Sequence, residues 1–406
     1  MKKNYKKVMK IIVIICIIVL IIDISYLIYK KFIYKPKVSY FDSINAFEVI
    51  EDGYITVGSN NNNKDGYEKA KITKYDNNKE KVWEKLYNKK YNSSYFEIKQ
   101  DDEYLIAVGD YEANKEERKD NVRSALIVKY DSEGKILNEK RFQVLGDSKF
   151  TNLLVVPDGY LVVGQSIYEN MTLGLSDKGG AFLIKYDKDL NEVWRSNYGG
   201  SKSAIYNDLI ILNDNIYAVG KDAVNTGIIS KYNMNGERLI TTNYSYTDSF
   251  GFTSITSIEN NLYVIGAKKV DKDKSSYDTD SLIVIYDLDC NNINEVTYKG
   301  KGIERFNKAI VDNDKIIIAG QTGIYNKEKS SDQENIFSYN GIFAIYDSNL
   351  KKLELTNYQE ETDDYFTDIA KKDNTYIISG YSTYEENDYI SKLITYTTSG
   401  KLIGEE

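Results

Sequence analysis

Short apolar runs separated by polar turns recur along the chain, and the first kind of run ends in glycine. Each run follows turn-forming residues, which predicts a short β-strand. The run GYLVVG, which ends at Gly164, is apolar at successive positions, so both of its faces are expected to be buried. Seven glycines close such runs: Gly58, Gly109, Gly164, Gly220, Gly266, Gly320 and Gly380.

The second kind of run ends in tyrosine, as in ALIVKYD and AFLIKYD. The seven tyrosines are Tyr75, Tyr130, Tyr186, Tyr232, Tyr286, Tyr346 and Tyr396, with successive gaps of 55, 56, 46, 54, 60 and 50 residues. Such a period indicates a repeat architecture. The repeats are predicted at about 44–91, 92–143, 144–198, 199–244, 245–298, 299–358 and 359–406.

Two spacings within the repeat are nearly constant. Six of the tyrosines are followed after 12 residues by an aromatic residue. A closing glycine follows after 14 residues at each of Phe150, Tyr206, Phe252, Phe306 and Phe366. Both stretches contain turn residues near their middle, such as Pro157, Asp158 and Gly159, so each is predicted to be a β-hairpin. Four antiparallel strands per repeat, buried on both faces, predict an all-β fold: a seven-bladed β-propeller.

The N-terminus differs from the repeats. Residues 1–10 carry five lysines and are expected to form a cytoplasmic basic tail, whereas residues 11–29 are apolar except for Asp23, Ser25 and tyrosines. This length is typical of a transmembrane helix, and it exceeds the apolar region of a cleaved signal peptide. We therefore predict a signal-anchor helix at 11–29, a juxtamembrane linker at 30–37 and a propeller domain at 38–406. The lysine distribution slightly favours an extracellular propeller on a single-pass membrane protein.

The string DGYLVVG…GGAFLIKYDKDLNEVWRSNYGGS, within residues 158–201, resembles the β-propeller repeats of exported bacterial proteins. The resemblance covers all seven repeats, is strongest at 150–200, and implies a seven-bladed propeller without implying an activity. The tryptophan of this pattern is present only as Trp83 and Trp194. Propellers that bind a quinone cofactor carry this tryptophan in every blade, so they match poorly.

Composition restricts the possible chemistry. The net charge of −8 argues against nucleic-acid binding, and the absence of histidine removes the most common general base and metal ligand. Segments 187–192 and 287–292 resemble the start of a calcium loop but lack its glycine and final glutamate, so they are predicted to be hairpin turns. Cys290 has no cysteine partner outside the anchor. We predict no cofactor, no metal site and no catalytic residues.

The length variation of the repeats lies between the glycine and the tyrosine, where the gap ranges from 12 to 26 residues. In an up-and-down blade these loops share one face, and insertions on one face of a repeat protein mark a binding surface. The loops are polar and contain tyrosines, which suit recognition of a protein or a cell-surface glycan. The candidate binding residues are Tyr67, Tyr111, Tyr168, Tyr277, Tyr325, Tyr339 and Tyr384.

Two further expectations concern activity and ring closure. Carboxylate pairs in the long loops leave open a carbohydrate-active enzyme, a glycoside hydrolase or lyase. These carboxylates are Glu116, Glu117, Asp120, Asp271, Asp273, Asp278 and Asp280. The last repeat ends early, and VSYF at 38–41 precedes the first repeat, so we expect 38–41 to pair beside the last blade and close the ring.

Overall fold

The computed structural model describes residues 41–61, 67–112, 123–142, 147–167, 180–199, 204–222, 226–244, 249–270, 279–300, 302–325, 337–360, 362–384 and 388–405. The chain divides into two compact units, Met1–Ser39 and Tyr40–Glu406, and the described residues belong to the second. Within them, no helix has the length and apolar character needed to cross a membrane. The predicted tail, anchor and linker lie outside the described residues.

Twenty-eight strands are described, and the first sixteen form four sheets of four consecutive antiparallel strands. The first two sheets contain β1 Asp42–Ile50, β2 Gly53–Asn60, β3 Lys69–Asp76, β4 Lys81–Leu86, β5 Ser93–Asp101, β6 Tyr104–Glu112, β7 Arg123–Tyr130 and β8 Ile136–Phe142. The next two contain β9 Asp147–Val156, β10 Gly159–Ile167, β11 Gly180–Tyr186, β12 Glu192–Tyr198, β13 Ile205–Leu212, β14 Asn215–Lys221, β15 Gly227–Asn233 and β16 Arg238–Asn243.

The remaining strands form an eight-stranded sheet and a last four-stranded sheet. The eight-stranded sheet contains β17 Ser249–Ile258, β18 Asn261–Lys269, β19 Thr279–Tyr286, β20 Asn292–Tyr298, β21 Gly302–Asp312, β22 Lys315–Tyr325, β23 Phe337–Asp347 and β24 Lys352–Tyr358. Its two halves, β17–β20 and β21–β24, are joined by one parallel pair, Thr279–Ile303. The last sheet contains β25 Asp363–Lys372, β26 Thr375–Tyr384, β27 Asp388–Thr397 and β28 Leu402–Glu405.

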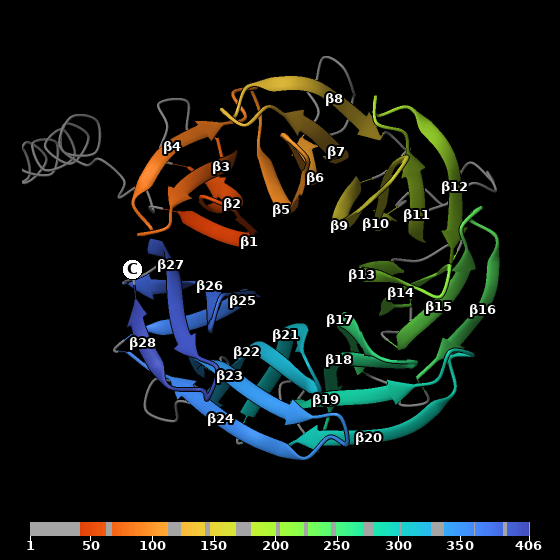
Figure 1. Cartoon of the computed structure of the whole chain (residues 1–406), viewed down its shortest axis with the longest axis vertical. Helices are drawn as coiled ribbons and strands as arrows, with labels where there is room; N and C mark the ends of the chain where they lie inside the picture. Colours follow the sequence, from red (N-terminus) through yellow and green to blue (C-terminus); the bar gives the residue numbers. More distant parts are fainter. Residues whose placement is uncertain are drawn as a thin grey trace, which may run out of the picture. The chain divides into compact units, whose positions relative to one another are not determined.

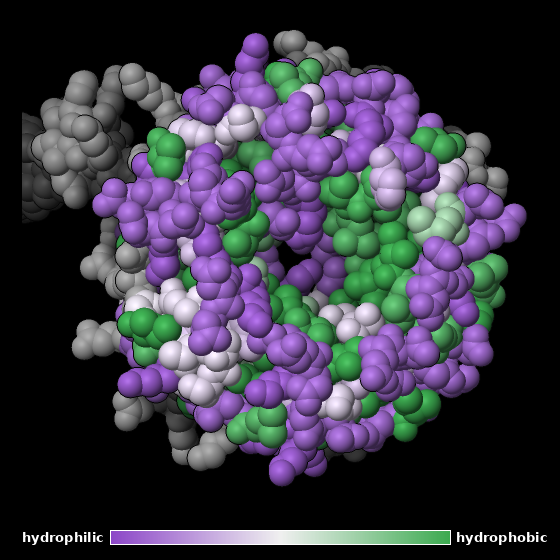
Figure 2. Space-filling model, viewed as in Figure 1, coloured by the Kyte–Doolittle hydropathy of each residue, from purple (hydrophilic) through white to green (hydrophobic). Residues whose placement is uncertain are grey.

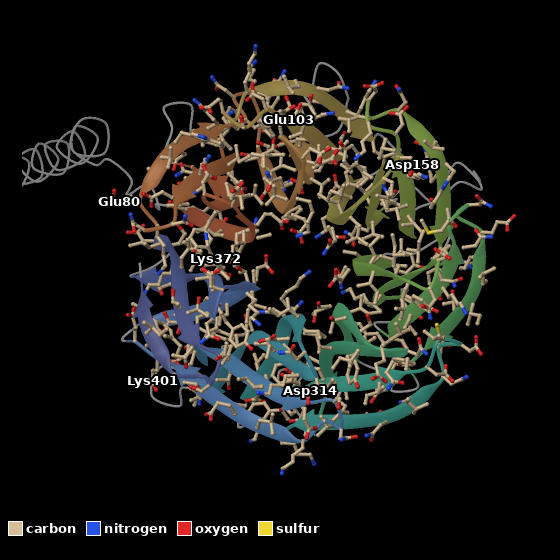
Figure 3. The ribbon with its side chains drawn as sticks, in the orientation of Figure 1. Glu80, Glu103, Asp158, Asp314, Lys372 and Lys401 are labelled. Atoms are coloured by element: carbon tan, nitrogen blue, oxygen red, sulfur yellow. The ribbon has the colours of Figure 1, made fainter. Side chains whose placement is uncertain are left out.

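The sheets follow one another around a central axis in sequence order (Figure 1). The strands nearest the axis, called here the inner strands, are β1, β5, β9, β13, β17, β21 and β25. One end of the ring, the loop face, is the end at which the first and third strands of each group begin and the second and fourth strands end. The opposite end, the turn face, carries short hairpin turns; Glu80, Glu103, Asp158, Asp314, Lys372 and Lys401 in Figure 3 belong to these turns or their edges.

The recurring aromatic residues form the core between neighbouring sheets. In six of the seven groups, an aromatic residue at the end of the outer strand or directly after it packs on the residue of the next inner strand that is also aromatic, with ring centroids 5.5–6.2 Å apart. In five groups the inner-strand ring also contacts the tyrosine of its own third strand at 6.1–6.3 Å, as Tyr206 contacts Tyr232. The constant spacings of the sequence therefore place aromatic rings where adjacent sheets meet.

A β-bulge interrupts the pairing of every inner strand with the strand that follows it. In six of the seven bulges the extra residue is Asn or Thr, and its side chain donates a hydrogen bond of 2.6–2.9 Å to a backbone carbonyl of the next inner strand. The donors are Asn45, Thr151, Asn207, Thr253, Asn307 and Thr367. The seventh bulge residue, Phe96, has no side-chain donor. Six of seven junctions therefore share one polar link.

The first and last sheets contact each other directly. Thr367 donates its bulge hydrogen bond to the carbonyl of Ile44, and the amide of Phe47 donates to Asp368 at 3.1 Å. Buried apolar residues from both sheets form one cluster there. Of the predicted closing segment 38–41, only Phe41 lies among the described residues; it forms one parallel bridge with Tyr389 of β27. Antiparallel pairing among β25–β28 builds the last sheet.

The segments 187–192 and 287–292 are hairpin turns, as the sequence predicts. The Asp187 carboxylate accepts hydrogen bonds from the amides of Asp189 and Asn191 at 2.9 and 2.8 Å, and Asp287 accepts the same pair from Asp289 and Asn291. These carboxylate oxygens therefore stabilise the turn by accepting hydrogen bonds from its backbone amides. Among the described residues, no three His, Cys, Asp or Glu side chains are grouped to hold a metal ion.

Candidate functional site

The candidate tyrosines differ widely in their surroundings. Tyr67 is half-buried and its ring lies 5.6 Å from that of Tyr91. Tyr111 departs from the expectation of an exposed loop residue: β6 continues past Gly109, and Tyr111 is only 4% exposed, between Tyr87 and Arg141. Tyr325 and Tyr384 end strands β22 and β26, while Tyr168 and Tyr277 lie outside the described residues.

Tyr339 belongs to a continuous row of five aromatic rings at the loop face. Consecutive ring centroids are 5.0, 4.9, 5.5 and 5.0 Å apart, and all five residues are half-buried. In order, the row contains Tyr339 of β23, Tyr365 of β25, Tyr381 of β26, Tyr389 of β27 and Phe41. It thus runs from the eight-stranded sheet across the last sheet to the start of β1.

The row is apolar with hydrogen-bonding edges. Burial raises the pKa of Tyr381 to about 12 and raises that of Tyr365, so both hydroxyls are protonated near neutral pH and can donate. Exposed Ile390 follows Tyr389 in β27, and exposed Ile324 lies in β22 beside the partner of Tyr339. Half-buried aromatic rings with exposed aliphatic neighbours are suited to contact a macromolecule.

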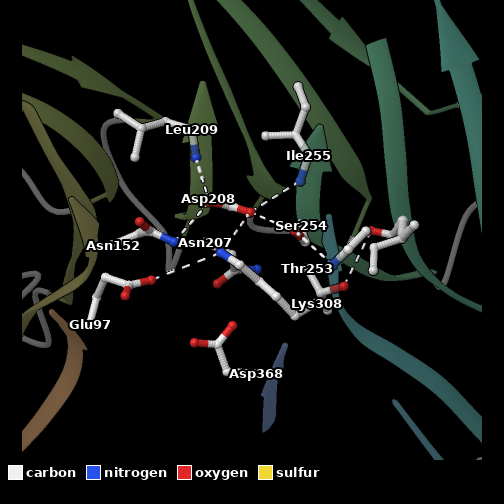
Figure 4. A network of polar contacts seen from close by, with 12 residues as sticks. Glu97, Asn152, Asn207, Asp208, Leu209, Thr253, Ser254, Ile255, Lys308 and Asp368 are labelled. Atoms are coloured by element: carbon white, nitrogen blue, oxygen red, sulfur yellow. Dashed lines mark hydrogen bonds and ion pairs between the residues drawn. The ribbon is translucent and has the colours of Figure 1, made fainter. Parts of the chain in front are cut away.

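A second feature is a network of polar side chains at the axis of the ring (Figure 4). It is formed by the residue that follows the bulge in six of the inner strands: Glu97, Asn152, Asp208, Ser254, Lys308 and Asp368. The equivalent residue of β1 is Ala46, which belongs to the apolar core. The Asp208 carboxylate accepts hydrogen bonds from Asn152, Ser254 and the amides of Leu209 and Ile255. These bonds connect three neighbouring inner strands.

Lys308 connects strands that are not neighbours. Its ammonium lies 3.2 Å from Asp208 on β13 and 3.9 Å from Glu97 on β5. Burial alone would lower the pKa of Lys308, but the carboxylates of Asp208, Glu97 and Asp368 raise it, so this lysine is charged. Since β5 and β21 lie across the ring from each other (Figure 1), the Lys308 side chain spans the axis.

Asp368 is the least compensated of the axial carboxylates. It is 6% exposed and accepts hydrogen bonds from the amides of Phe47 and Ile369. Burial, reinforced by the charge of Glu97, raises the pKa of Asp368 to about 6. Among the described residues no lysine or arginine lies within 4 Å of it. The axis therefore holds a network of paired charges in which one carboxylate, that of Asp368, is incompletely neutralised.

Sequence reasoning found one member of the row, Tyr339, but missed its other rings and the axis. Tyr365, Tyr381 and Tyr389 lie in strands, whereas the search for binding residues considered the variable loops. A signal for the axis is present: a polar residue stands two positions after the inner-strand aromatic in otherwise apolar strands, as in Tyr206 and Asp208. Of the carboxylates considered for catalysis, only Asp280 lies among the described residues, and it is 5% exposed in β19.

Comparison with known proteins identifies the architecture. No protein-family profile and no curated protein sequence matches the chain. Among solved structures, the WD40 β-propeller domain of Doa1 is similar over 87% of this chain and 96% of that one, at 11% identity and a TM-score of 0.50. The fold is a β-propeller.

Two further solved structures are similar to this chain at comparable TM-scores. Sqt1 from Chaetomium thermophilum matches with 11% identity and a TM-score of 0.52, covering 91% of this chain and 88% of its own. Sqt1 from Saccharomyces cerevisiae matches with 9% identity and a TM-score of 0.51, covering 90% and 86%. At such identities the similarity concerns the fold alone, so the role of this propeller has to be argued from its own surfaces.

Proposed function

We propose that this chain is a membrane-anchored, extracellular seven-bladed propeller that binds a protein or a cell-surface glycan through its loop face. The observation that carries the proposal is the row of half-buried aromatic rings from Tyr339 to Phe41. The four-stranded sheets and the two halves of the eight-stranded sheet support a count of seven blades. The apolar segment at 11–29 supports the anchor.

The location of the row agrees with the sequence argument about loops. Tyr339 and Tyr389 lie in β23 and β27, close to where the 26-residue and 16-residue glycine-to-tyrosine stretches return to the sheets. Variable loops would supply specificity around a fixed aromatic base. Tyrosine and phenylalanine rings lose little conformational entropy on binding and bury a large area, which is why they dominate recognition surfaces.

The proposal is tested by photo-crosslinking in intact cells. Replacing Tyr389 with the photoreactive amino acid p-benzoylphenylalanine keeps an aromatic ring in the row, and irradiation should give a crosslinked adduct of higher mass. The matched control carries the same amino acid at Val193, an exposed position on the outer strand β12. Adducts that form equally at both positions, or at neither, would contradict a binding role for the loop face.

A further inference from the structure

The turn-face mouth of the central channel has one charged side and one apolar side. Two residues beyond the axial network, the inner strands place Glu48, Lys99, Leu154, Ile210, Thr256, Ile310 and Ala370 in equivalent positions, all half-buried. Glu48 and Lys99 are paired at 3.0 Å. In Figure 2, apolar surface borders the central opening on the side of β9 and β13, and polar surface borders it on the side of β5.

The apolar side of the mouth is continuous with the core yet remains accessible. Leu154 packs against the cluster between the third and fourth sheets, Ile210 against the next cluster, and Ile310 against the cluster before the last sheet. None of the three reaches full burial. Apolar side chains held rigidly around an opening offer area to a partner at little entropic cost.

The floor of the mouth carries excess negative charge. Four carboxylates, Glu48, Glu97, Asp208 and Asp368, face the two ammonium groups of Lys99 and Lys308, so the ionised cluster has a net charge of −2 (4 − 2 = 2). Burial also raises the pKa of Glu48 despite its contact with Lys99. An additional cation would offset the cost of keeping these carboxylates ionised inside the protein.

We propose that this mouth binds a segment of a partner protein that inserts one Lys or Arg side chain toward the axial carboxylates. Apolar residues on either side of the inserted side chain pack on Leu154, Ile210 and Ile310. The excess negative charge favours a cationic group, and the half-buried aliphatic side chains favour apolar residues beside that group in the partner. A peptide can offer both features, whereas a free metal ion offers only the charge. This surface is separate from the aromatic row at the loop face and does not depend on it.

The test is selection of peptides from a random nonapeptide phage library on the full chain in phospholipid nanodiscs, after subtraction on empty nanodiscs. Selected sequences are expected to contain a Lys or Arg with apolar neighbours. By fluorescence anisotropy, replacing this basic residue with Gln in a selected peptide should weaken binding at least tenfold. A selection without this pattern, or equal affinity of the Lys or Arg peptide and its Gln version, would overturn the proposal.

Variants of the protein locate the site. Asp368→Asn and Glu48→Gln each remove one charge at the axis and should weaken the basic peptide by about fivefold to tenfold, with less effect on its Gln version. Asp158→Asn is the matched control, because it removes a carboxylate that is 70% exposed on the same face. Ile210→Ser should weaken both peptides, and Tyr381→Ala at the loop face should weaken neither. Equal losses with Asp158→Asn and Asp368→Asn would place the binding elsewhere.

Discussion

At the glycine that recurs within each second strand, the bulge of the inner strand brings a carbonyl oxygen into the space that a side chain would need. A Cβ at Gly164 would overlap the carbonyl of Lys149, and a Cβ at Gly58 would overlap that of Ser43. The same overlap with the residue before the inner-strand aromatic, or its equivalent, occurs at all seven glycines. The recurring glycine of the sequence is therefore a consequence of close backbone approach at the bulge.

Gly164→Ala is expected to destabilise the protein by about 2–3 kcal/mol, because the backbone of β9 must move away from the new methyl group. The change is measured as a shift of the urea unfolding midpoint. Gly404→Ala is the matched control: nothing lies within 4 Å of its Cβ position in β28. That control should be neutral or slightly stabilising. A neutral Gly164→Ala would show that the bulge can relax.

At the scale of the strands, the contacts between neighbouring sheets follow the order of the chain: a side chain of one sheet contacts the backbone of the sheet that comes next. The bulge side chain of one inner strand donates to the following inner strand, as Thr253 of β17 donates to the carbonyl of Phe306 on β21 at 2.7 Å. The outer strands show the same order: Trp83 of β4 packs over Gly134 in the turn of the second sheet, and Trp194 packs over Gly236 in the fourth. Each tryptophan therefore packs on a glycine in the hairpin turn of the following sheet.

Thr253→Val removes the donor while preserving the shape of the side chain, and it leaves the Phe306 carbonyl without that bond. We expect a loss of roughly 1–2 kcal/mol in the free energy of unfolding, measured by urea denaturation. Thr253→Ser retains a hydroxyl and should recover most of this loss. If the valine variant unfolds at the same urea concentration as the native protein while the serine variant unfolds at a lower one, the hydrogen bond contributes nothing and the methyl packing explains the residue.

The sequence predicted the strands well because their signals are local and repeated. The glycine and tyrosine runs, the two hairpin spacings and the turns at Asp187 and Asp287 each depend on residues that are close in sequence. The bulges and the axial network could not be predicted in this way, because they join residues such as Glu97 and Lys308 that are far apart in the chain. Tyr111 was misplaced for a related reason: a strand may continue past its repeated motif, and only pairing with β5 and β7 shows where it ends.

At the scale of the whole ring, charged residues from different sheets meet on the axis. Burial and the Glu97 charge raise the pKa of Asp368 from its usual 3.8 to about 6. In the unfolded chain this carboxyl titrates in its ordinary range, so between pH 7 and 5 the folded protein takes up a proton that the unfolded chain does not. The contribution of Asp368 to stability therefore rises as the pH falls over this interval.

Asp368→Asn isolates this effect. The free energy of unfolding of the native protein relative to the variant is expected to increase by about 1.4 kcal/mol between pH 7 and pH 5. Asp110, whose pKa burial also raises to about 6, is present in both proteins and cancels in the difference. Urea unfolding at pH 7, 6 and 5 measures the gap. A gap that stays constant would show that Asp368 is ionised throughout this range in the folded ring.

The packing of Trp83 on Gly134 also limits how the number of repeats in the gene can change. Removing the second repeat, residues 92–143, would bring Trp83 over the turn that contains Leu190, whose side chain is fully buried. A change of repeat number by recombination would thus join surfaces that were fitted to other partners. A substitution in one repeat therefore limits which substitutions the next repeat can accept. We expect the residues at each contact between neighbouring repeats to change together, so that the seven repeats do not diverge independently.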